Sequence, residues 1–207
     1  MPRYNDYDFS LLENVTIVNA DSPTKDIYKE EKPLTVEVGC GNGHFLTAQA
    51  AAHPDLSFCG IDMKSERIVR CMQKVNAQGL NNIFFAVGDA MNVLPKCFAD
   101  SQISRIYMTF PDPWPKKRHH KNRLFKPEFL DIVWNKLKTD GDFIFITDFE
   151  EYFEWSKAFA ESDTRFDITF CGTIGENDER DYLTQSLFGE KWKREERNFY
   201  LLEFTKK

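Results

Sequence analysis

The segment from residue 110 to residue 123, FPDPWPKKRHHKNR, joins one carboxylate to a run of cations. Asp112 stands among three prolines beside Trp114, and the cations that follow are Lys116, Lys117, Arg118, Lys121 and Arg123. Residues 111–123 thus carry five cations against one carboxylate, a net charge of +4, on a chain whose formal net charge is −6. A concentrated basic patch on an acidic protein indicates contact with phosphate groups, and so favours a nucleic acid as partner.

The same segment contains the residue types needed to hold a base for a reaction. Proline restricts φ and stiffens a loop, so the side chains between the prolines keep a fixed geometry. Trp114 could stack on a base that has been extracted from its neighbours. Asp112 would then face the reacting group. The alternative is a solvated basic loop, with Trp114 packed in the core.

A second pattern that could do chemistry is VEVGCGNGHF (36–45), which places Gly39, Gly41 and Gly43 between an expected strand and an expected helix. Glycines at such a turn let the backbone approach a ligand closely near a helix N-terminus. A glycine-rich turn can also be purely structural. The neighbouring acids therefore decide how the pattern is interpreted.

Three carboxylates stand at successive strand ends. Glu37 lies inside the first strand, where it needs a partner or an open cleft. Asp62 ends the second, near the spacing at which an acid binds ribose hydroxyls. Asp89 ends the third, where it could equally cap the next helix. A dinucleotide prefers G-x-G-x-x-G, whereas the sulfonium and ammonium groups of S-adenosylmethionine suit a carboxylate-rich pocket.

Alternating strands and helices must position these residues. We expect strands at 34–38, 57–61, 83–87, 103–110 and 142–147, and helices at 44–53, 64–79, 90–97, 126–138 and 150–162. This alternation predicts an α/β fold with a doubly wound, mostly parallel sheet. The last two runs, 165–170 and 198–204, have no long helix between them, so we expect an antiparallel hairpin there.

Composition bounds the domain organisation and the compartment. Residues 1–33 are polar and irregular, and we interpret them as an N-terminal arm that orders when something binds, followed by one domain at 34–207. No apolar run nears the roughly 20 residues that cross a bilayer, and no secretory signal is apparent. The five cysteines are odd in number and include no C-x-x-C pair. This indicates a cytoplasmic protein without disulfides, a metal site or a membrane partner.

Two motifs carry a family resemblance. The order E-x-G-x-G-x-G, with acids after the second and third strands, resembles class I methyltransferases, whose seven-stranded sheet ends in an antiparallel hairpin. The string FPDPWPKKRHHKNRL (110–124), together with VEVGCGNGHFL (36–46), is similar to the tRNA (guanine-N7)-methyltransferase family from about residue 34 to 148. The resemblance implies methyl transfer from S-adenosylmethionine to guanine N7 in the variable loop of tRNA.

The resemblance also implies the site. Asp112 would be the catalytic carboxylate. The cofactor would be bound by Glu37, Gly39, Gly41, Gly43, Asp62, Asp89 and Asp112. The substrate would contact Lys116 and Asp148, and the RNA would contact Lys117, Arg118, His119, His120, Lys121 and Arg123.

The carboxyl end departs from the T-x-[YF]-E motif of that family. The best alignment, SLFGEKW, makes Ser186 and Phe188 substrate contacts, unless the motif begins at Thr184. The mixed-charge stretch EKWKREER (190–197) is expected to be a solvated face, although its Lys191, Lys193 and Arg194 could extend the tRNA footprint.

Guanine N7 carries an in-plane lone pair, so its methylation needs no general base. We therefore expect Asp112 to accept hydrogen bonds from the guanine and to counter the developing positive charge. One alternative is methylation of an exocyclic base amine, because P-D-P-W partly matches the N-P-P-[YFW] loop of such enzymes. Two others are a non-catalytic RNA-binding module, which the intact acids disfavour, and a Rossmann dehydrogenase, which the glycine spacing disfavours.

Overall fold

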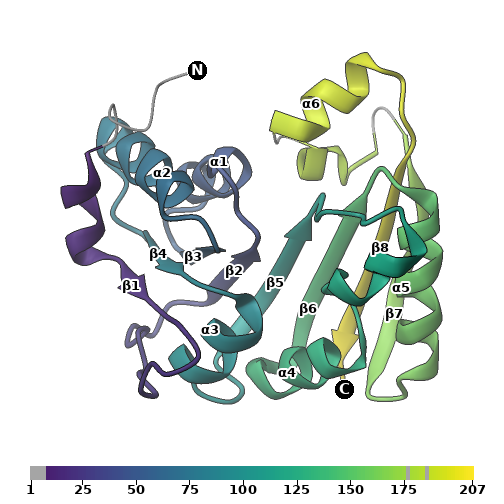
Figure 1. Ribbon diagram of the computed structural model, residues 1–207, viewed down its shortest axis with the longest axis horizontal. Helices are drawn as coiled ribbons and strands as arrows, with labels where there is room; N and C mark the ends of the chain where they lie inside the picture. Colours follow the sequence, from purple (N-terminus) through teal and green to yellow (C-terminus); the bar gives the residue numbers. More distant parts are fainter. Residues whose placement is uncertain (1–7, 176–177, 185–186) are drawn as a thin grey trace.

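A single mixed sheet forms the centre of the computed structural model, which describes residues 8–175, 178–184 and 187–207 (Figure 1). Within these residues the strand order is β1-β4-β3-β2-β5-β6-β8-β7. The strands are β1 (Thr16–Ile17), β2 (Leu34–Val38), β3 (Ser57–Asp62), β4 (Ile83–Val87), β5 (Ile103–Thr109), β6 (Leu137–Thr147), β7 (Phe166–Ile174) and β8 (Phe199–Lys206). Neighbours from β1 to β6 are parallel, and β8 is antiparallel to β6 and β7. The predicted mostly parallel sheet with an antiparallel hairpin is confirmed.

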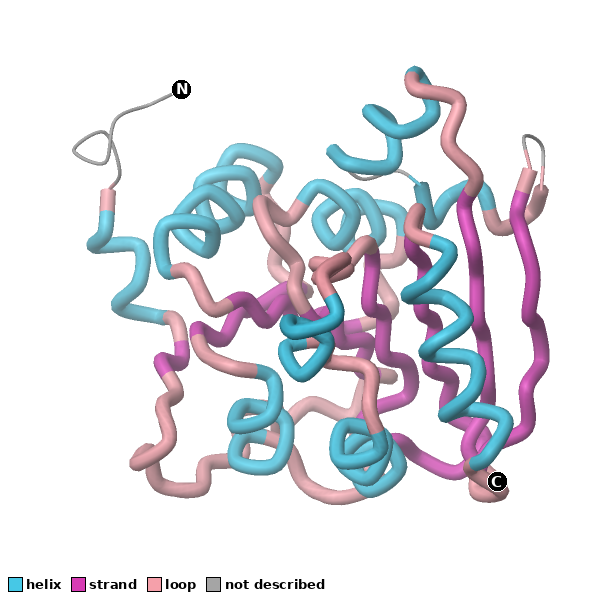
Figure 2. Tube along the Cα trace, turned by 45° about the vertical axis from the view of Figure 1, so that its right-hand side comes forward, coloured by secondary structure: helices cyan, strands magenta, loops and turns pink. Residues whose placement is uncertain are grey.

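Helices cover both faces of the sheet, as a doubly wound fold requires (Figures 1 and 2). One face carries α1 (His44–Ala52) and α2 (Ser65–Gln78), and the other carries α3 (Ala90–Cys97), α4 (Pro127–Lys136) and α5 (Glu150–Ser162). The shorter helices are η2 (Phe9–Asn14), η3 (Lys117–Asn122), η4 (Asp181–Thr184) and α6 (Leu187–Arg194). Helix α6 covers part of the stretch at 190–197, in which Lys191 and residues 194–197 are exposed, as expected for a solvated face.

Local chemistry fixes several helix ends. Asp89 is the N-cap of α3, and its side chain accepts a hydrogen bond from the Met91 N–H at 3.0 Å. Pro127 occupies the first turn of α4. Proline lacks an N–H, and the N–H groups of the first turn make no hydrogen bond within the helix, so proline costs nothing there. Gly79 ends α2 in the left-handed conformation, with φ of +65°. Each of these three boundaries lies within one residue of the boundary that the sequence pattern predicts.

The segment before β2 packs onto the sheet. β1 pairs in parallel with β4, and the Val18 N–H donates to the Val87 carbonyl at 2.7 Å. Val18 and Tyr28 are buried in the main core. An eighth strand, β1, thus joins the seven expected ones. The buried Val18 and Tyr28 hold the segment that contains it against the main core. The division of the chain at residue 34 stays a prediction.

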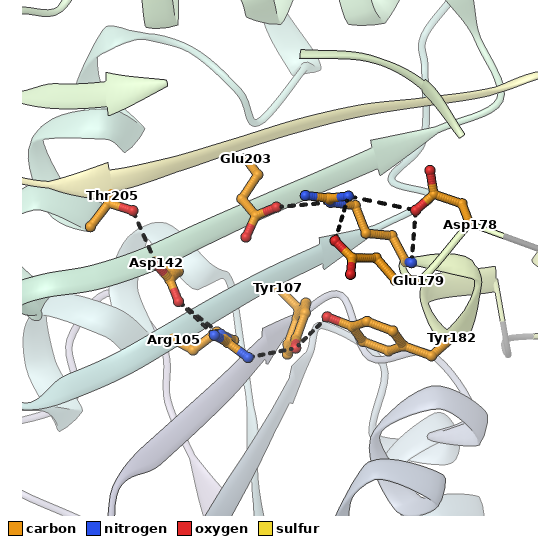
Figure 3. Close-up of polar contacts among 9 residues, drawn as sticks. Arg105, Tyr107, Asp142, Asp178, Glu179, Tyr182, Glu203 and Thr205 are labelled. Atoms are coloured by element: carbon orange, nitrogen blue, oxygen red, sulfur yellow. Dashed lines mark hydrogen bonds and ion pairs between the residues drawn. The ribbon is translucent and has the colours of Figure 1, made fainter. Parts of the chain in front are cut away.

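Polar side chains hold the segment at 178–184 against one face of β5, β6 and β8 (Figure 3). Arg105 on β5 donates to Asp142 on β6 at 2.6 Å, and Asp142 also accepts from Thr205 on β8 at 3.1 Å. The hydroxyl of Tyr107 lies 3.3 Å from that of Tyr182. In the described part of the chain this face is therefore joined to its covering segment by polar contacts as well as by apolar packing.

Gly43 begins α1 at a place where a side chain has no room. Its φ is +71°, and a Cβ there would lie 2.7 Å from the Sγ of Cys71. We expect Gly43→Ala to lower the free energy of unfolding by about 2–4 kcal/mol, since left-handed backbone and steric overlap both contribute. Urea denaturation measures the loss.

Gly79 provides a matched control, because its φ is +65° and a Cβ there would meet nothing within 4 Å. Gly79→Ala should cost only the backbone term, about 1–2 kcal/mol. Adding Cys71→Ala to Gly43→Ala should recover part of the loss. Equal losses in the two single variants would contradict the steric explanation.

Candidate active site

The carboxyl ends of β2, β3, β4 and β5 meet at one edge of the sheet, because these strands run parallel. Glu37, Asp62, Asp89 and Asp112 lie at or near these four ends in turn. The helices that follow β2 and β5 pack on opposite faces. The edge between these two strands is therefore the switch point at which such sheets bind ligands.

Glu37 is a buried carboxylate with one oxygen left over. Its side chain sits inside β2, and its Oε1 accepts a hydrogen bond from the Thr109 hydroxyl at 2.7 Å. Its Oε2 is buried and has no hydrogen-bond partner among the described residues. Burial above all raises the pKa of Glu37 to about 7, and the charge of Asp62 adds to the rise while the Thr109 hydrogen bond opposes it. A cation placed beside the Oε2 of Glu37 would therefore stabilise the ionised carboxylate.

Asp62 organises the glycine loop. Its Oδ2 accepts from the Gly41 N–H at 3.0 Å and from Arg67 at 3.2 Å, and its Oδ1 accepts from the Lys64 N–H at 2.9 Å. The side chain is buried. The carboxylate thus fixes the loop backbone against the end of β3, and ribose hydroxyls would share it with these donors.

Asp89 uses its carboxylate as the cap of α3. The capping alternative that the sequence raised is therefore confirmed. The residue is half-buried at the end of β4, and only its Oδ1 accepts the capping bond. Its predicted contact with a cofactor stays a prediction.

The loop after β5 holds two non-glycine residues in the left-handed region. Phe110 has φ of +47° and Trp114 has φ of +46°, which costs roughly 1–2 kcal/mol for each. The Phe110 ring packs edge-on against Phe199, and the Trp114 ring against His119. Asp112 lies between the two strained residues and is exposed. Strain of this kind clusters at functional sites, where the surrounding structure maintains it.

Most of the basic segment, by which we mean residues 116–123, faces solvent. The exposed cations are Lys116, Lys117, Arg118 and Lys121. His119 and His120 are half-buried, and the Nε2 of His120 lies 3.2 Å from the Oε1 of Glu151. The exposure of Lys117, Arg118 and Lys121 supports their predicted contact with RNA. The RNA contacts of these residues and of the two histidines, and the substrate contact of Lys116, stay predictions.

Arg123 does not belong to this exposed surface. Its side chain is 0% exposed. Its Nε donates to the Pro113 carbonyl at 2.9 Å, and its Nη2 donates to Glu151 at 3.1 Å. A guanidinium buried between the loop and α5 has no surface for a phosphate. The prediction that Arg123 binds RNA is therefore corrected: the residue holds the loop.

Asp148 follows β6 and is joined to the C-terminal segment. Its Oδ2 accepts from Arg197 at 2.6 Å, and the Arg197 guanidinium lies 3.7 Å from the centre of the Trp192 ring. These contacts connect the segment that follows α6 to the carboxyl end of β6. A substrate that binds Asp148, as predicted, would have to share it with Arg197.

The remaining predicted contacts lie in the C-terminal segment. Ser186 lies outside the described residues, as does the side chain of Phe188, and both contacts stay predictions. Thr184, the alternative start of the motif, is buried and donates its hydroxyl hydrogen to the Asp181 carbonyl at 2.7 Å. Lys193 pairs with Asp181 at 2.6 Å.

Three side chains at this edge were not singled out from the sequence. Thr109 ends the strand beside that of Glu37, so strand pairing could have indicated it. Arg67 lies five residues after Asp62, within the first turn of α2. Arg197 meets Asp148 across 49 residues, and no local pattern signals such a pair.

Across residues 8–175, 178–184 and 187–207, no three His, Cys, Asp or Glu side chains gather in a way that could hold a metal ion. None of the described helices combines the length and the apolar character that a membrane span requires.

Comparison with known proteins places the fold and the family. The model of the family described as "Putative methyltransferase" matches residues 31–202. A tRNA (guanine-N(7)-)-methyltransferase of Pseudomonas entomophila is 42% identical over 137 residues, which are 65% of this chain and 57% of that protein. One of Brevibacillus brevis is 40% identical over 132 residues, covering 64% and 61%. The chain thus matches less than two thirds of the length of these relatives.

A solved structure, that of the 16S rRNA methyltransferase KamB, is similar in fold. Its TM-score is 0.64 at 14% identity, and the match covers 84% of this chain and 88% of that one. The expected class I methyltransferase fold is therefore confirmed. Because the family model spans most of the chain, and the glycine loop and the loop after β5 both lie within it, the chain belongs to this methyltransferase family.

Proposed function

We propose that this protein transfers a methyl group from S-adenosylmethionine to N7 of a guanine in tRNA, giving 7-methylguanosine, with the variable loop as the expected position. The observation that carries the proposal is the buried Glu37 carboxylate, whose Oε2 has no partner among the described residues, beside an ordered glycine loop. The names of the matched relatives support the substrate.

The carboxylates and the glycine loop at the carboxyl edge fit S-adenosylmethionine. Its ammonium group would give the Oε2 of Glu37 a cationic partner, which this oxygen lacks among the described residues. Asp62 would accept hydrogen bonds from the ribose, and the backbone of Gly39, Gly41 and Gly43 would lie against the methionine part. Asp89 would contact the adenine through the oxygen that does not cap α3.

Asp112 would carry the chemistry. When bound, S-adenosylmethionine would supply an electrophilic methyl group to the lone pair of guanine N7. The S–CH3 bond would break, and the sulfur would keep its electron pair in the leaving group, S-adenosylhomocysteine. Asp112 would accept hydrogen bonds from the N1–H and the amino group of guanine and stabilise the positive charge that develops on the purine. Lys116, Asp148, Ser186 and Phe188 would complete the substrate contacts. No proton has to be removed from N7, so His119 and His120 serve phosphate binding or loop structure.

The exposed cations of η3 would place the tRNA through its phosphates. We further propose a cytoplasmic location, where tRNA is available and the five cysteines, all free, would stay reduced.

A transfer assay tests the proposal. Tritiated methyl groups should pass to bulk unmodified tRNA, and nucleoside analysis should find them in 7-methylguanosine. Asp112→Asn should bind S-adenosylmethionine normally but turn over about 10²–10³-fold more slowly, because an electrostatic stabiliser is lost. Asp167→Asn, on the edge strand β7, is the matched control. Label in a methylated exocyclic amine would overturn the proposal.

The pKa of Glu37 makes cofactor binding depend on pH. The ammonium group favours the ionised carboxylate, so S-adenosylmethionine affinity should rise between about pH 6 and about pH 8, with a proton released on binding. The ligand-free protein should lose stability from about pH 5 to about pH 7, since the folded state there holds a proton that the unfolded state has lost.

Titration calorimetry in buffers of different ionisation enthalpy measures the released proton. Glu37→Gln should remove the pH dependence, and Glu128→Gln, an exposed acid on α4, should retain it. Wild-type affinity that stays constant across this range would refute the role of Glu37.

The basic segment should make tRNA binding depend on salt. Lys117→Gln with Lys121→Gln should reduce the slope of log K against log salt by about 1.5, since each phosphate contact contributes about 0.7–0.9. The control is Lys29→Gln with Lys138→Gln, two exposed lysines near the amino ends of β2 and β6. Equal slopes in both double variants would exclude η3 from the tRNA interface.

A further inference from the structure

Arg123 differs in its surroundings from every other cation of the basic segment. Lys116, Lys117, Arg118 and Lys121 are exposed, whereas the Arg123 side chain is 0% exposed. A guanidinium stays charged in proteins, so its burial must be compensated by hydrogen bonds and a counter-charge. The groups that compensate the buried charge show which parts of the fold Arg123 joins.

The guanidinium bridges the loop after β5 and the start of α5. Its Nε donates to the Pro113 carbonyl at 2.9 Å, and its Nη2 donates to Glu151 at 3.1 Å. Its central carbon lies 5.1 Å from the ring centre of Tyr152 and 5.2 Å from that of Trp155. A planar cation between two aromatic rings of one helix has little freedom to move.

The same two aromatic residues also hold the chain that follows Arg123. The Tyr152 hydroxyl accepts from the Phe125 N–H at 3.1 Å, and the Trp155 Nε1 donates to the Phe125 carbonyl at 2.9 Å. The His120 ring packs edge-on against Trp155. Helix α5 therefore fixes the far end of the basic segment, and Arg123 extends that attachment back to Pro113.

Pro113 lies between Asp112 and the strained Trp114. A fixed Pro113 carbonyl determines where the peptide before it can lie, and so where Asp112 projects. We infer that Arg123 is a positioning residue, which holds Asp112 in place for methyl transfer by clamping the loop to α5. This inference rests on the proposed function.

Stability alone does not explain an arginine here. The Nη1 of Arg123 is buried and has no hydrogen-bond partner within the described ranges. Its counter-ion, Glu151, is about half exposed. Replacing an incompletely paired buried charge by an apolar side chain is often neutral or stabilising. The fork geometry, which lets one side chain reach Pro113 and Glu151 while packing between two rings, is what lysine or methionine could not reproduce.

Two variants separate geometry from charge and from folding. Arg123→Met fills the space without donors, and Arg123→Lys keeps the charge without the fork. In both, kcat for tRNA methylation should fall about 10²-fold, the loss typical of a misplaced reacting group. The Kd of S-adenosylmethionine and the KM of tRNA should stay within about twofold. The melting temperature should change little.

Hydrogen–deuterium exchange gives a readout that needs no activity. The peptide covering 110–118 should exchange faster in both variants than in the wild type. The matched control is Arg165→Met: this arginine pairs with Asp131 and Asp163 and packs on Trp134, near the opposite end of α5. It should leave both kcat and the exchange of that peptide unchanged.

Several results would overturn the inference. These are wild-type kcat in Arg123→Met, recovery of kcat by Arg123→Lys, unchanged exchange at 110–118, or a parallel loss of kcat, cofactor affinity and melting temperature. If the wild-type protein itself does not methylate tRNA, the proposed function fails. The exchange comparison then still decides whether Arg123 clamps the loop.

Discussion

An ionisable carboxylate inside strand β2 is the constraint on which the carboxyl edge depends. A charge buried in a sheet is costly unless it is paired, and among the described residues Glu37 has only the Thr109 hydroxyl as a hydrogen-bond partner. Asp62, next to it on β3, is instead satisfied by backbone N–H groups and Arg67. The two acids therefore have different tasks. Asp62 fixes the glycine loop. The Oε2 of Glu37 has no partner among the described residues, and it is the oxygen that the ammonium group of the proposed cofactor would contact.

The basic segment contains two kinds of cation that look alike in the sequence. Four of them face solvent, where phosphates of the proposed tRNA substrate could reach them, and the buried Arg123 faces α5. The loop that they flank stores backbone strain at Phe110 and Trp114. Strained conformations persist only where the surroundings determine them, so a loop of this kind needs both its prolines and its attachment to α5.

The C-terminal segment is joined by polar contacts to the sheet and to the carboxyl end of β6. Its polar contacts with β5, β6 and β8 hold residues 178–184 against the sheet (Figure 3). The Arg197–Asp148 pair then joins the segment that follows α6 to the end of β6. Asp148, a predicted substrate contact, is thus linked to a segment whose sequence departs from the family motif.

The sequence by itself determined the order of the elements and the residue types at the edge. Strands buried on both faces of a parallel sheet are continuous apolar runs, so β2 and β4 were predicted residue for residue. Two-residue β1 has no periodicity, and β6 begins at Leu137 instead of 142 because Asp140, with φ of +60°, is accommodated within the strand. Only the tertiary structure decided which cation is buried. Arg123 is locally like its neighbours, and its burial depends on Glu151, 28 residues away, and on the aromatic residues beside it. The hydrophobic periodicity of a sequence reports the environment along one helix or strand. A contact such as that between Arg123 and Glu151 forms only when two elements pack together.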